Sequence, residues 1–366
     1  MKKVFKLTIS LFLIFSSIIL ACTGITIKTE DNKIIQGRTI EYGENNLNSK
    51  LVISPRGKEY QSLTPDGKFE GHKWKAKYGY VGAALINELF IGEGINEAGL
   101  NAGLFYFPHY GSLTKYEKKI SKKSIVDMQF VSWLLSNFST VEEVKEGLKN
   151  IKVVNIGYDE KGNPLPTAHW RVGDAKGGNI VIEIVNNGEV KIYENKVGVV
   201  TNSPDYEWHV KNLNNYVNVY AGNAKDFDMN GQKIFSFGAG TGAMGLPGDI
   251  TPPSRFVRAF YYLSTIRPIK NSKEGVNEAF HILNNFDLPI GVEYPAEHRE
   301  YIPKDLSSAT QWTAISSLND REFYYKTMYN SQIRKVDLKK IDFTKVDYQA
   351  IPLDEKPEEN IQELTF

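Results

Sequence analysis

The only cysteine of this 366-residue chain, Cys22, stands where an apolar leader ends and a β-strand pattern begins. The chain opens with Met1-Lys2-Lys3, and an apolar run over residues 7–20 leads to Ala21. A basic start, a short apolar core and a small residue are typical of a cleavable signal peptide. We therefore expect residues 1–21 to be removed and the protein to be periplasmic or secreted.

Cleavage after Ala21 would place the new N-terminus at the start of a β-hairpin. Residues 23–29 alternate apolar and polar side chains, residues 30–33 predict a turn, and residues 34–42 return. An N-terminal cysteine carries a thiol and an α-amine, so one residue supplies both a nucleophile and a base. This position therefore indicates an N-terminal-nucleophile hydrolase.

Two other fates of Cys22 remain open at this point. A lone cysteine can be a small buried hydrophobe. Residues 19–22 also resemble a bacterial lipoprotein signal, which would make the chain a non-catalytic, lipid-anchored binding lipoprotein. Acylation would consume the α-amine, so anchoring and catalysis exclude one another. A lipoprotein usually has a flexible polar tether after its cysteine, whereas here a strand pattern starts at once, and this favours catalysis.

The composition excludes several classes of function. Loss of the leader removes Lys2, Lys3 and Lys6 and no acidic residue, which changes the net charge from +1 to about −2. This balance predicts no nucleic-acid partner. No later segment is long and apolar enough to predict an integral membrane span. The six histidines show no metal-ligand spacing, and we expect neither a metal nor another cofactor.

Strand patterns come in hairpin runs and helix patterns in pairs, which predicts an α+β fold with antiparallel sheets. Helices are expected over residues 124–138, from a capping box at residues 140–143, and over residues 253–266 and 273–283. Further strands are expected at residues 51–54, 80–85, 100–107, 168–172, 179–185, 190–194, 197–201, 309–318 and 322–329. We expect one catalytic domain over residues 22–352 and an acidic tail over residues 353–366.

The glycine-rich run at residues 238–245 resembles a nucleotide loop only superficially. No clear apolar strand precedes it and no helix opens at its end, because Pro247-Gly248-Asp249 follows. We expect a turn in which the backbone approaches another group closely.

Several motifs in order make the chain similar to the choloylglycine hydrolase family, which includes bile salt hydrolases and penicillin V acylases. The Cys22-Thr23 start is followed by four motifs: Gly37-Arg38-Thr39-Ile40-Glu41-Tyr42, Gly94-Ile95-Asn96-Glu97-Ala98-Gly99-Leu100, Thr201-Asn202-Ser203-Pro204-Asp205-Tyr206-Glu207-Trp208-His209 and Leu246-Pro247-Gly248-Asp249-Ile250-Thr251-Pro252-Pro253-Ser254-Arg255-Phe256. The resemblance implies a four-layer αββα sandwich of N-terminal-nucleophile hydrolases and a homo-oligomer, either a dimer or a tetramer.

The resemblance also implies roles at the nucleophile. Cys22 matches the residue that attacks the amide carbon, with its own α-amine as base and a thioester as intermediate. Arg38 matches the arginine beside the thiol. Glu41 stands where the family usually has an aspartate that contacts the α-amine. The longer side chain keeps the charge but changes the reach, so a weakened, degenerate member of the family is a further alternative.

Three more positions complete the implied site. Asn202 matches the side-chain donor of the oxyanion hole, and Tyr106 the position whose backbone amide is the second donor. Arg255 matches the arginine that completes the charged cluster. His209 follows in the same motif as Asn202, and we expect a structural role for it because this mechanism needs no histidine base.

The resemblance implies a small-molecule amide substrate with an apolar acyl group. The motif after Asn202 resembles the penicillin V acylase branch with an export signal, which points to penicillin V or an N-acyl-homoserine lactone. A conjugated bile salt is the alternative. Four aromatic residues are expected either to line an acyl pocket or to belong to the core: Phe105, Tyr106, Phe107 and Tyr110.

Overall fold

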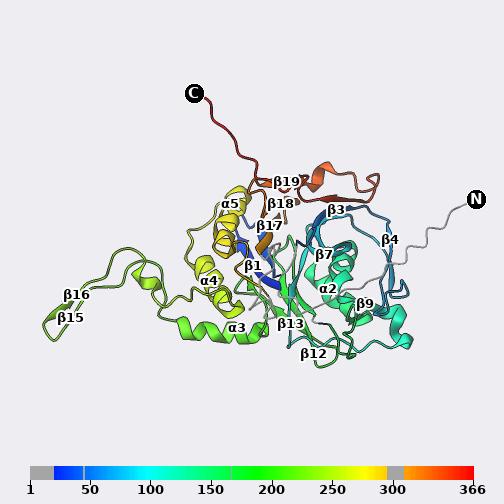
Figure 1. Ribbon diagram of the computed structural model, residues 1–366, viewed down its shortest axis with the longest axis horizontal. Helices are drawn as coiled ribbons and strands as arrows, with labels where there is room; N and C mark the ends of the chain where they lie inside the picture. Colours follow the sequence, from blue (N-terminus) through cyan, green and yellow to red (C-terminus); the bar gives the residue numbers. More distant parts are fainter. Residues whose placement is uncertain (1–19, 44–45, 166, 295–308) are drawn as a thin grey trace, which may run out of the picture.

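Two large antiparallel sheets lie face to face at the centre of the molecule (Figure 1). The computed structural model describes residues 20–43, 46–165, 167–294 and 309–366. In spatial order, the first sheet contains β14 (Val199–Val200), β1 (Leu20–Lys28), β2 (Ile34–Tyr42), β17 (Ala309–Ser317), β18 (Glu322–Thr327) and β19 (Arg334–Asp337). The second contains β13 (Glu189–Glu194), β12 (Asn179–Val185), β11 (Ala168–Gly173), β8 (Asn101–Tyr106), β7 (Asn87–Asn96), β6 (Tyr80–Leu85), β3 (Lys50–Ser54) and β20 (Gln349–Pro352).

Helices cover the outer face of each sheet. On the first sheet, α4 (Pro252–Thr265) contacts β1, and α5 (Ser272–Leu283) contacts β2 and β17. On the second sheet, α1 (Phe130–Asn137) contacts β7 and β8, and α2 (Val141–Gly147) follows it along the chain. α2 opens after Thr140 as expected, because the Thr140 side chain accepts a hydrogen bond from Glu143 N. The Glu143 carboxylate accepts from Ser139 N, one residue before the position that a full capping box uses. The layers are therefore α, β, β and α, as the resemblance implied.

Smaller elements complete the described part of the chain. They are the hairpin of β4 (Glu59–Gln61) and β5 (Lys73–Lys75), the parallel pair of β9 (Ser124–Val126) and β10 (Lys152–Val154), the helix α3 (Tyr206–Asn212), and the hairpin of β15 (Phe227–Met229) and β16 (Gln232–Ile234).

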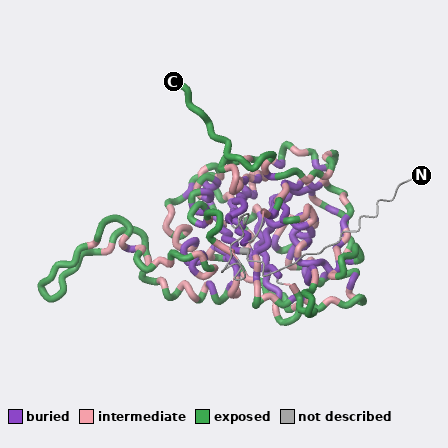
Figure 2. Tube along the Cα trace, in the orientation of Figure 1, coloured by how far each residue is buried: buried purple, intermediate pink, exposed green. Residues whose placement is uncertain are grey.

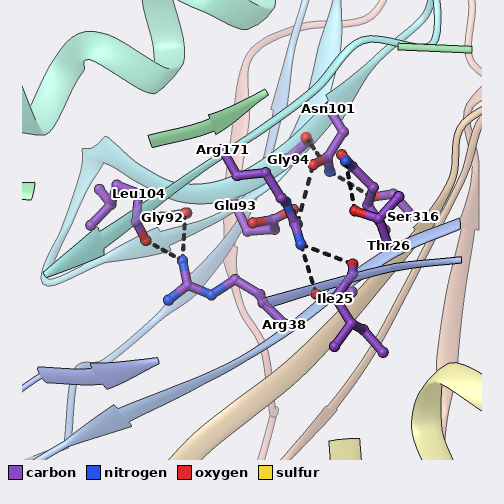
Figure 3. A network of polar contacts seen from close by, with 12 residues as sticks. Ile25, Thr26, Arg38, Gly92, Glu93, Gly94, Asn101, Leu104, Arg171 and Ser316 are labelled. Carbon is purple, nitrogen blue, oxygen red and sulfur yellow. Dashed lines mark hydrogen bonds and ion pairs between the residues drawn. The ribbon is translucent and has the colours of Figure 1, made fainter. Parts of the chain in front are cut away.

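Two buried arginines connect the two sheets reciprocally (Figure 3). Arg38 of β2 crosses to the second sheet, where its guanidinium donates to the carbonyls of Gly92 and Leu104. Arg171 of β11 crosses in the opposite direction and donates to the carbonyls of Ile25 and Gly37 at 3.0 and 2.9 Å. Buried charged groups need such partners because their desolvation is costly. The paired sheets therefore hold cations at their interface, next to the strand that carries Cys22.

The predicted first hairpin is present, with Cys22 opposite Ile40 and Gly24 opposite Arg38. β1 begins at Leu20, so the strand continues for two residues before Cys22, and Ala21 pairs with Glu41. The rest of the predicted leader, residues 1–19, lies outside the described residues.

The helix predicted for residues 124–138 is wrong in its first half. Ser124–Val126 forms β9 instead, and α1 begins only at Phe130. Between them, the buried Asp127 carboxylate accepts hydrogen bonds from Met128 N, Ile156 N and Thr167 Oγ1. These bonds tie Asp127 to distant residues. Helical spacing in the sequence does not reveal such tertiary partners.

An arm extends from the body between α3 and α4 and ends in the β15–β16 hairpin (Figure 1). The glycine-rich run lies in this arm. The expected close approach of its backbone is confirmed at Gly242, where a Cβ would lie 2.7 Å from Tyr220 O, and is wrong for three other glycines. Gly238, Gly240 and Gly245 have positive φ angles, and a Cβ at any of them would meet nothing within 4 Å. These glycines therefore provide left-handed turns in an exposed loop.

The buried residues concentrate between and around the two sheets, while the arm and the C-terminal tail are exposed (Figure 2). Leu353 is buried, and residues 355–366 are exposed. Within the described ranges, no helix has the length and apolar character required to cross a bilayer.

Candidate active site

Cys22 lies on β1 at the interface of the two sheets and has no exposed surface. Its backbone nitrogen donates a hydrogen bond of 2.8 Å to Oδ1 of Asn202, a residue that follows β14. In this chain the nitrogen belongs to the Ala21–Cys22 peptide. Cleavage at that bond would turn the same nitrogen into the α-amine, which would already face Asn202.

Opposing influences act on the Cys22 thiol. Burial raises its pKa above the usual value, and the guanidinium of Arg38 lowers it. The Glu41 carboxylate raises the pKa as well, whereas Arg255 and a hydrogen bond from the Tyr106 backbone N–H lower it. Two arginines and one backbone amide thus favour the thiolate, which is the nucleophilic form.

Arg38 keeps its positive charge without a carboxylate partner among the described residues. Its Nη1 donates to two carbonyls of the second sheet and its Nε to Thr39 O at 3.1 Å, while Nη2 makes no hydrogen bond within the described part of the chain. The guanidinium carbon lies 4.4 Å from the centre of the Phe105 ring. This uncompensated charge lies close enough to Cys22 to lower the pKa of the thiol.

Asn202 and Tyr106 meet beside the thiol, as the resemblance implied. Asn202 Nδ2 donates to Tyr106 O at 2.9 Å, and the Tyr106 N–H points to the Cys22 sulfur. An oxyanion hole requires two preorganised donors next to the attacking atom. The Asn202 amide and the Tyr106 N–H are two hydrogen-bond donors that lie next to Cys22.

Arg255 joins the nucleophile to Asn202. It lies in the first turn of α4, buried, and its Nη2 donates to Asn202 Oδ1 at 2.8 Å. Its Nη1 donates to Cys22 O and, at 2.9 Å, to Thr23 Oγ1. Arg255 Nη2 and the Cys22 nitrogen therefore share one acceptor, Asn202 Oδ1, and this fixes which end of the Asn202 amide carries the donors.

Glu41 is buried on β2 and accepts a hydrogen bond of 3.0 Å from Thr310 Oγ1, while its Oε2 has no partner among the described residues. Burial raises its pKa to about 7, although the Arg255 charge acts in the opposite direction. A second, half-buried carboxylate, Glu293, also raises the pKa of Glu41. The structure thus places Glu41 in the predicted cluster. Sequence reasoning missed Thr310 and Glu293 because neither belongs to a motif around Cys22.

The aromatic residues predicted to line an acyl pocket divide into three groups. Tyr106 and Phe107 line a cavity of about 710 Å³, together with Pro108, Tyr158, Leu165 and more polar side chains. Phe105 is fully buried under Arg38, and Tyr110 is 45% exposed and does not line the cavity. Tyr106 lines this cavity, and its backbone N–H faces the Cys22 thiol. The cavity therefore lies next to the thiol.

No cluster of three or more histidine, cysteine, aspartate or glutamate side chains suited to a metal ion occurs within the described residues. Every group assembled around Cys22 is an acid, a base or a hydrogen-bond donor. Such groups can carry out nucleophilic acyl transfer at an amide carbon.

The chain is similar to known amide hydrolases over most of its length. The family profile named "Linear amide C-N hydrolases, choloylglycine hydrolase family" matches residues 22–353. A bile salt hydrolase/transferase of Clostridium perfringens is 35% identical over 87% of this chain and 92% of its own length. A penicillin V acylase of Pectobacterium atrosepticum is 24% identical over 94% of this chain and 88% of its own.

A solved structure agrees with this relationship. The crystal structure of a mutant conjugated bile acid hydrolase from Clostridium perfringens matches with a TM-score of 0.78 and 30% identity, over 94% of this chain and 100% of that one. Profile, sequence and fold coincide, and the protein is therefore a linear amide carbon–nitrogen hydrolase that belongs to the choloylglycine hydrolase family.

Proposed function

We propose that the chain, cut before Cys22, hydrolyses an N-acyl amide through a thioester on Cys22. The thiolate attacks the carbonyl carbon, and the Asn202 amide and Tyr106 N–H hold the resulting oxyanion. The α-amine passes the thiol proton to the leaving nitrogen, and the C–N bond breaks. Water then attacks the thioester, gives a proton back to the thiol through the α-amine, and releases the acid.

The observation that carries this proposal is the shared acceptor at Asn202. The Cys22 nitrogen and Arg255 both donate to Asn202 Oδ1, so Nδ2 is the end of the amide that can donate to an oxyanion. The cleaved nitrogen, the thiol and the oxyanion donors would then lie in one arrangement. An amide hydrolase with an N-terminal nucleophile needs these groups together.

Replacement of Cys22 tests the mechanism. We expect the mature Cys22→Ala variant to lose at least about 10³-fold in kcat, because it retains the oxyanion donors but no nucleophile. Cys22→Ser should retain a trace of activity, since a hydroxyl ionises far less readily than a thiol. Circular dichroism should show that both variants fold. Wild-type turnover by Cys22→Ala would overturn the proposal, and an inactive wild type on every amide tested would support a degenerate family member.

Two substrate classes have separate support. The 35% identity to a bile salt hydrolase/transferase, against 24% to a penicillin V acylase, favours a conjugated bile salt. The residues that follow Asn202 resemble the penicillin V acylase branch and favour penicillin V, and the predicted export signal also favours an N-acyl-homoserine lactone. A panel should compare kcat/KM for glycine- and taurine-conjugated bile salts, penicillin V and an N-acyl-homoserine lactone. A tenfold preference for any one of these classes would select it.

We also propose that the chain is exported and that its leader is cut before Cys22. The basic, apolar and small-residue pattern of residues 1–21 supports this, as does the family match, which begins at Cys22. The intact mass of protein exported with its own leader tests it. The mass of residues 22–366 alone is expected. An added lipid would support the lipoprotein alternative, because the α-amine would then be blocked.

Assembly into a homo-oligomer is the remaining proposal. The arm supports it, because a two-stranded hairpin is marginally stable alone in water. Several apolar side chains of the arm are exposed: Val217, Phe227, Met229, Phe235, Phe237 and Met244. Apolar groups gathered on a projecting segment mark a protein–protein contact.

A further inference from the structure

Thr201, Asn202 and Ser203 each make a hydrogen bond with a residue from another part of the chain. His169 of β11 has its Nε2 2.9 Å from Thr201 O, and His209 of α3 has its Nε2 2.8 Å from Asn202 O. The Ser203 hydroxyl donates to Pro108 O at 2.6 Å. Two buried histidines thus contact consecutive carbonyls, and the second of these carbonyls belongs to the residue that supplies the oxyanion amide.

The contacts of His209 define its protonation. A carbonyl oxygen only accepts hydrogen bonds, so Nε2 must carry a proton that it donates to Asn202 O. Nδ1 is buried and has no partner among the described residues, so a second proton there would be unsatisfied. Burial accordingly lowers the pKa of His209 to about 4. The ring is therefore a neutral donor at neutral pH, and it is not a base that could act on Cys22.

His209 also connects Asn202 to the helix that carries Arg255. Its ring stacks on Phe256, the next residue after Arg255, with centroids 4.7 Å apart and an interplanar angle of 11°. Thr201 makes a second link, because its hydroxyl donates to Pro252 O in the first turn of α4 at 3.2 Å. One side chain therefore contacts both the backbone of the oxyanion residue and the helix turn of its arginine partner.

We propose that His209 is a positioning residue that holds Asn202 in register with Arg255 by donating its Nε2 hydrogen to the Asn202 carbonyl. This inference rests on the proposed function, in which the Asn202 amide stabilises the oxyanion. Without the bond, the Asn202 carbonyl would be buried without this donor, and the backbone would shift to find another. A shift of about 1 Å at a catalytic group can cost about 100-fold in rate.

Two variants separate the donor from the ring. His209→Phe keeps an aromatic ring for Phe256 and loses the donor, whereas His209→Gln keeps an N–H donor and loses the ring. We expect kcat to fall about 10- to 100-fold in His209→Phe, with KM within about twofold, and to recover largely in His209→Gln. His281→Phe, at an exposed position of α5, is the matched control and should match the wild type.

The outcomes distinguish the possible roles. If His209 only packs, His209→Phe will be the better enzyme of the two, and that ranking would overturn the proposal. Wild-type kcat in both variants would overturn it as well. Activity in Cys22→Ala would instead refute the proposed function, independently of His209.

Discussion

At the scale of single residues, the site contains several buried charged side chains, which are rare in protein interiors. Arg38 and Arg255 are cationic and buried, and Glu41 is the acidic group that contacts the same cluster. Among the described residues, the hydrogen-bond acceptors of Arg38 are backbone oxygens. Arg38 therefore forms no ion pair with Glu41. Glu41 therefore remains available to the ammonium group that cleavage before Cys22 would create.

Before cleavage, Glu41 should make stability depend on pH. Its folded-state pKa of about 7 exceeds the ordinary value of 4.5, so the folded chain keeps a proton that the unfolded chain releases between these values. The contribution of Glu41 to the free energy of unfolding should therefore fall by on the order of 3 kcal/mol as the pH rises from 4.5 to 7. Glu41→Gln should remove this contribution, while those of Asp127 and His209, whose pKa values are also shifted, should remain. Urea denaturation at pH 5 and pH 8, on a chain that begins at residue 20, measures both.

An exposed carboxylate provides the control for this measurement. Glu207→Gln, on the surface of α3, should leave the pH dependence as it is in the parent chain. If Glu41→Gln and the parent lose the same stability between the two pH values, Glu41 is ionised in the folded chain throughout, and its assigned pKa is wrong.

At the scale of elements, the sequence predicted most of the strands and helices whose apolar residues recur at regular intervals. The hairpin of β1 and β2, the strand β6 and the helices α4 and α5 follow patterns of apolar residues with a period of 2 or 3.6. The strand β7 was not predicted, because its middle is Phe90-Ile91-Gly92-Glu93-Gly94, in which glycines interrupt the alternation. The helix α3 was missed because its signal is one cap, Asp205, whose side chain accepts from Trp208 N.

The residues of the site could be predicted from the sequence where they belong to a motif of the family. Six residues were placed from the family resemblance, Cys22 among them, and the structure brings the other five together around Cys22. The partners Thr310 and His169 were not predicted, because both reach the site from distant parts of the sequence. Thr310 pairs with Glu41 across two strands, and the His169 ring contacts Thr201 O. His169 lies in a strand pattern that gives no sign of what its ring contacts.

At Gly24 of β1 the two sheets fit closely together. A Cβ built there would lie 2.6 Å from Phe105 Cζ and 3.0 Å from Arg171 Nη1. Gly24→Ala should therefore push Phe105 and Arg171 away from β1 and lower the free energy of unfolding by about 1–3 kcal/mol. Chemical denaturation measures this loss. Gly248→Ala, at an exposed position without a positive φ and with nothing within 4 Å of a Cβ, is the control for loss of a glycine without a clash. An equal effect at both sites would contradict the packing argument.

At the scale of the whole molecule, the proposed catalysis and the proposed self-association depend on different parts of the chain. The charged site lies between the sheets, whereas the arm extends away from them and exposes apolar side chains (Figure 2). Changes in the arm should therefore alter assembly and leave the chemistry at Cys22 intact. The proposed homo-oligomer can be tested on this basis.

Two phenylalanines of the arm suit such a test, because Phe235 is 63% and Phe237 98% exposed. The double variant Phe235→Ser, Phe237→Ser should weaken self-association at least about 10-fold, since buried aromatic side chains dominate the energy of interfaces. Sedimentation velocity over a range of concentrations measures it. Ile361→Ser, at an 80% exposed position in the tail, is the control. A wild-type chain that stays monomeric would contradict the proposal.

The bonds that Arg38 and Arg171 make across the sheets have a consequence for divergence. Four of their acceptors are backbone carbonyls, at Gly92, Leu104, Ile25 and Gly37, and every amino acid supplies a backbone carbonyl. Apart from Glu93 and Asn101, whose side chains also accept hydrogen bonds from Arg171, the side chains of the neighbouring strands can therefore change over evolutionary time while the two arginines keep the sheets in the same relative position. An architecture fastened in this way needs only a few invariant residues, and relatives that share about a third of their sequence can still share the geometry around the nucleophile.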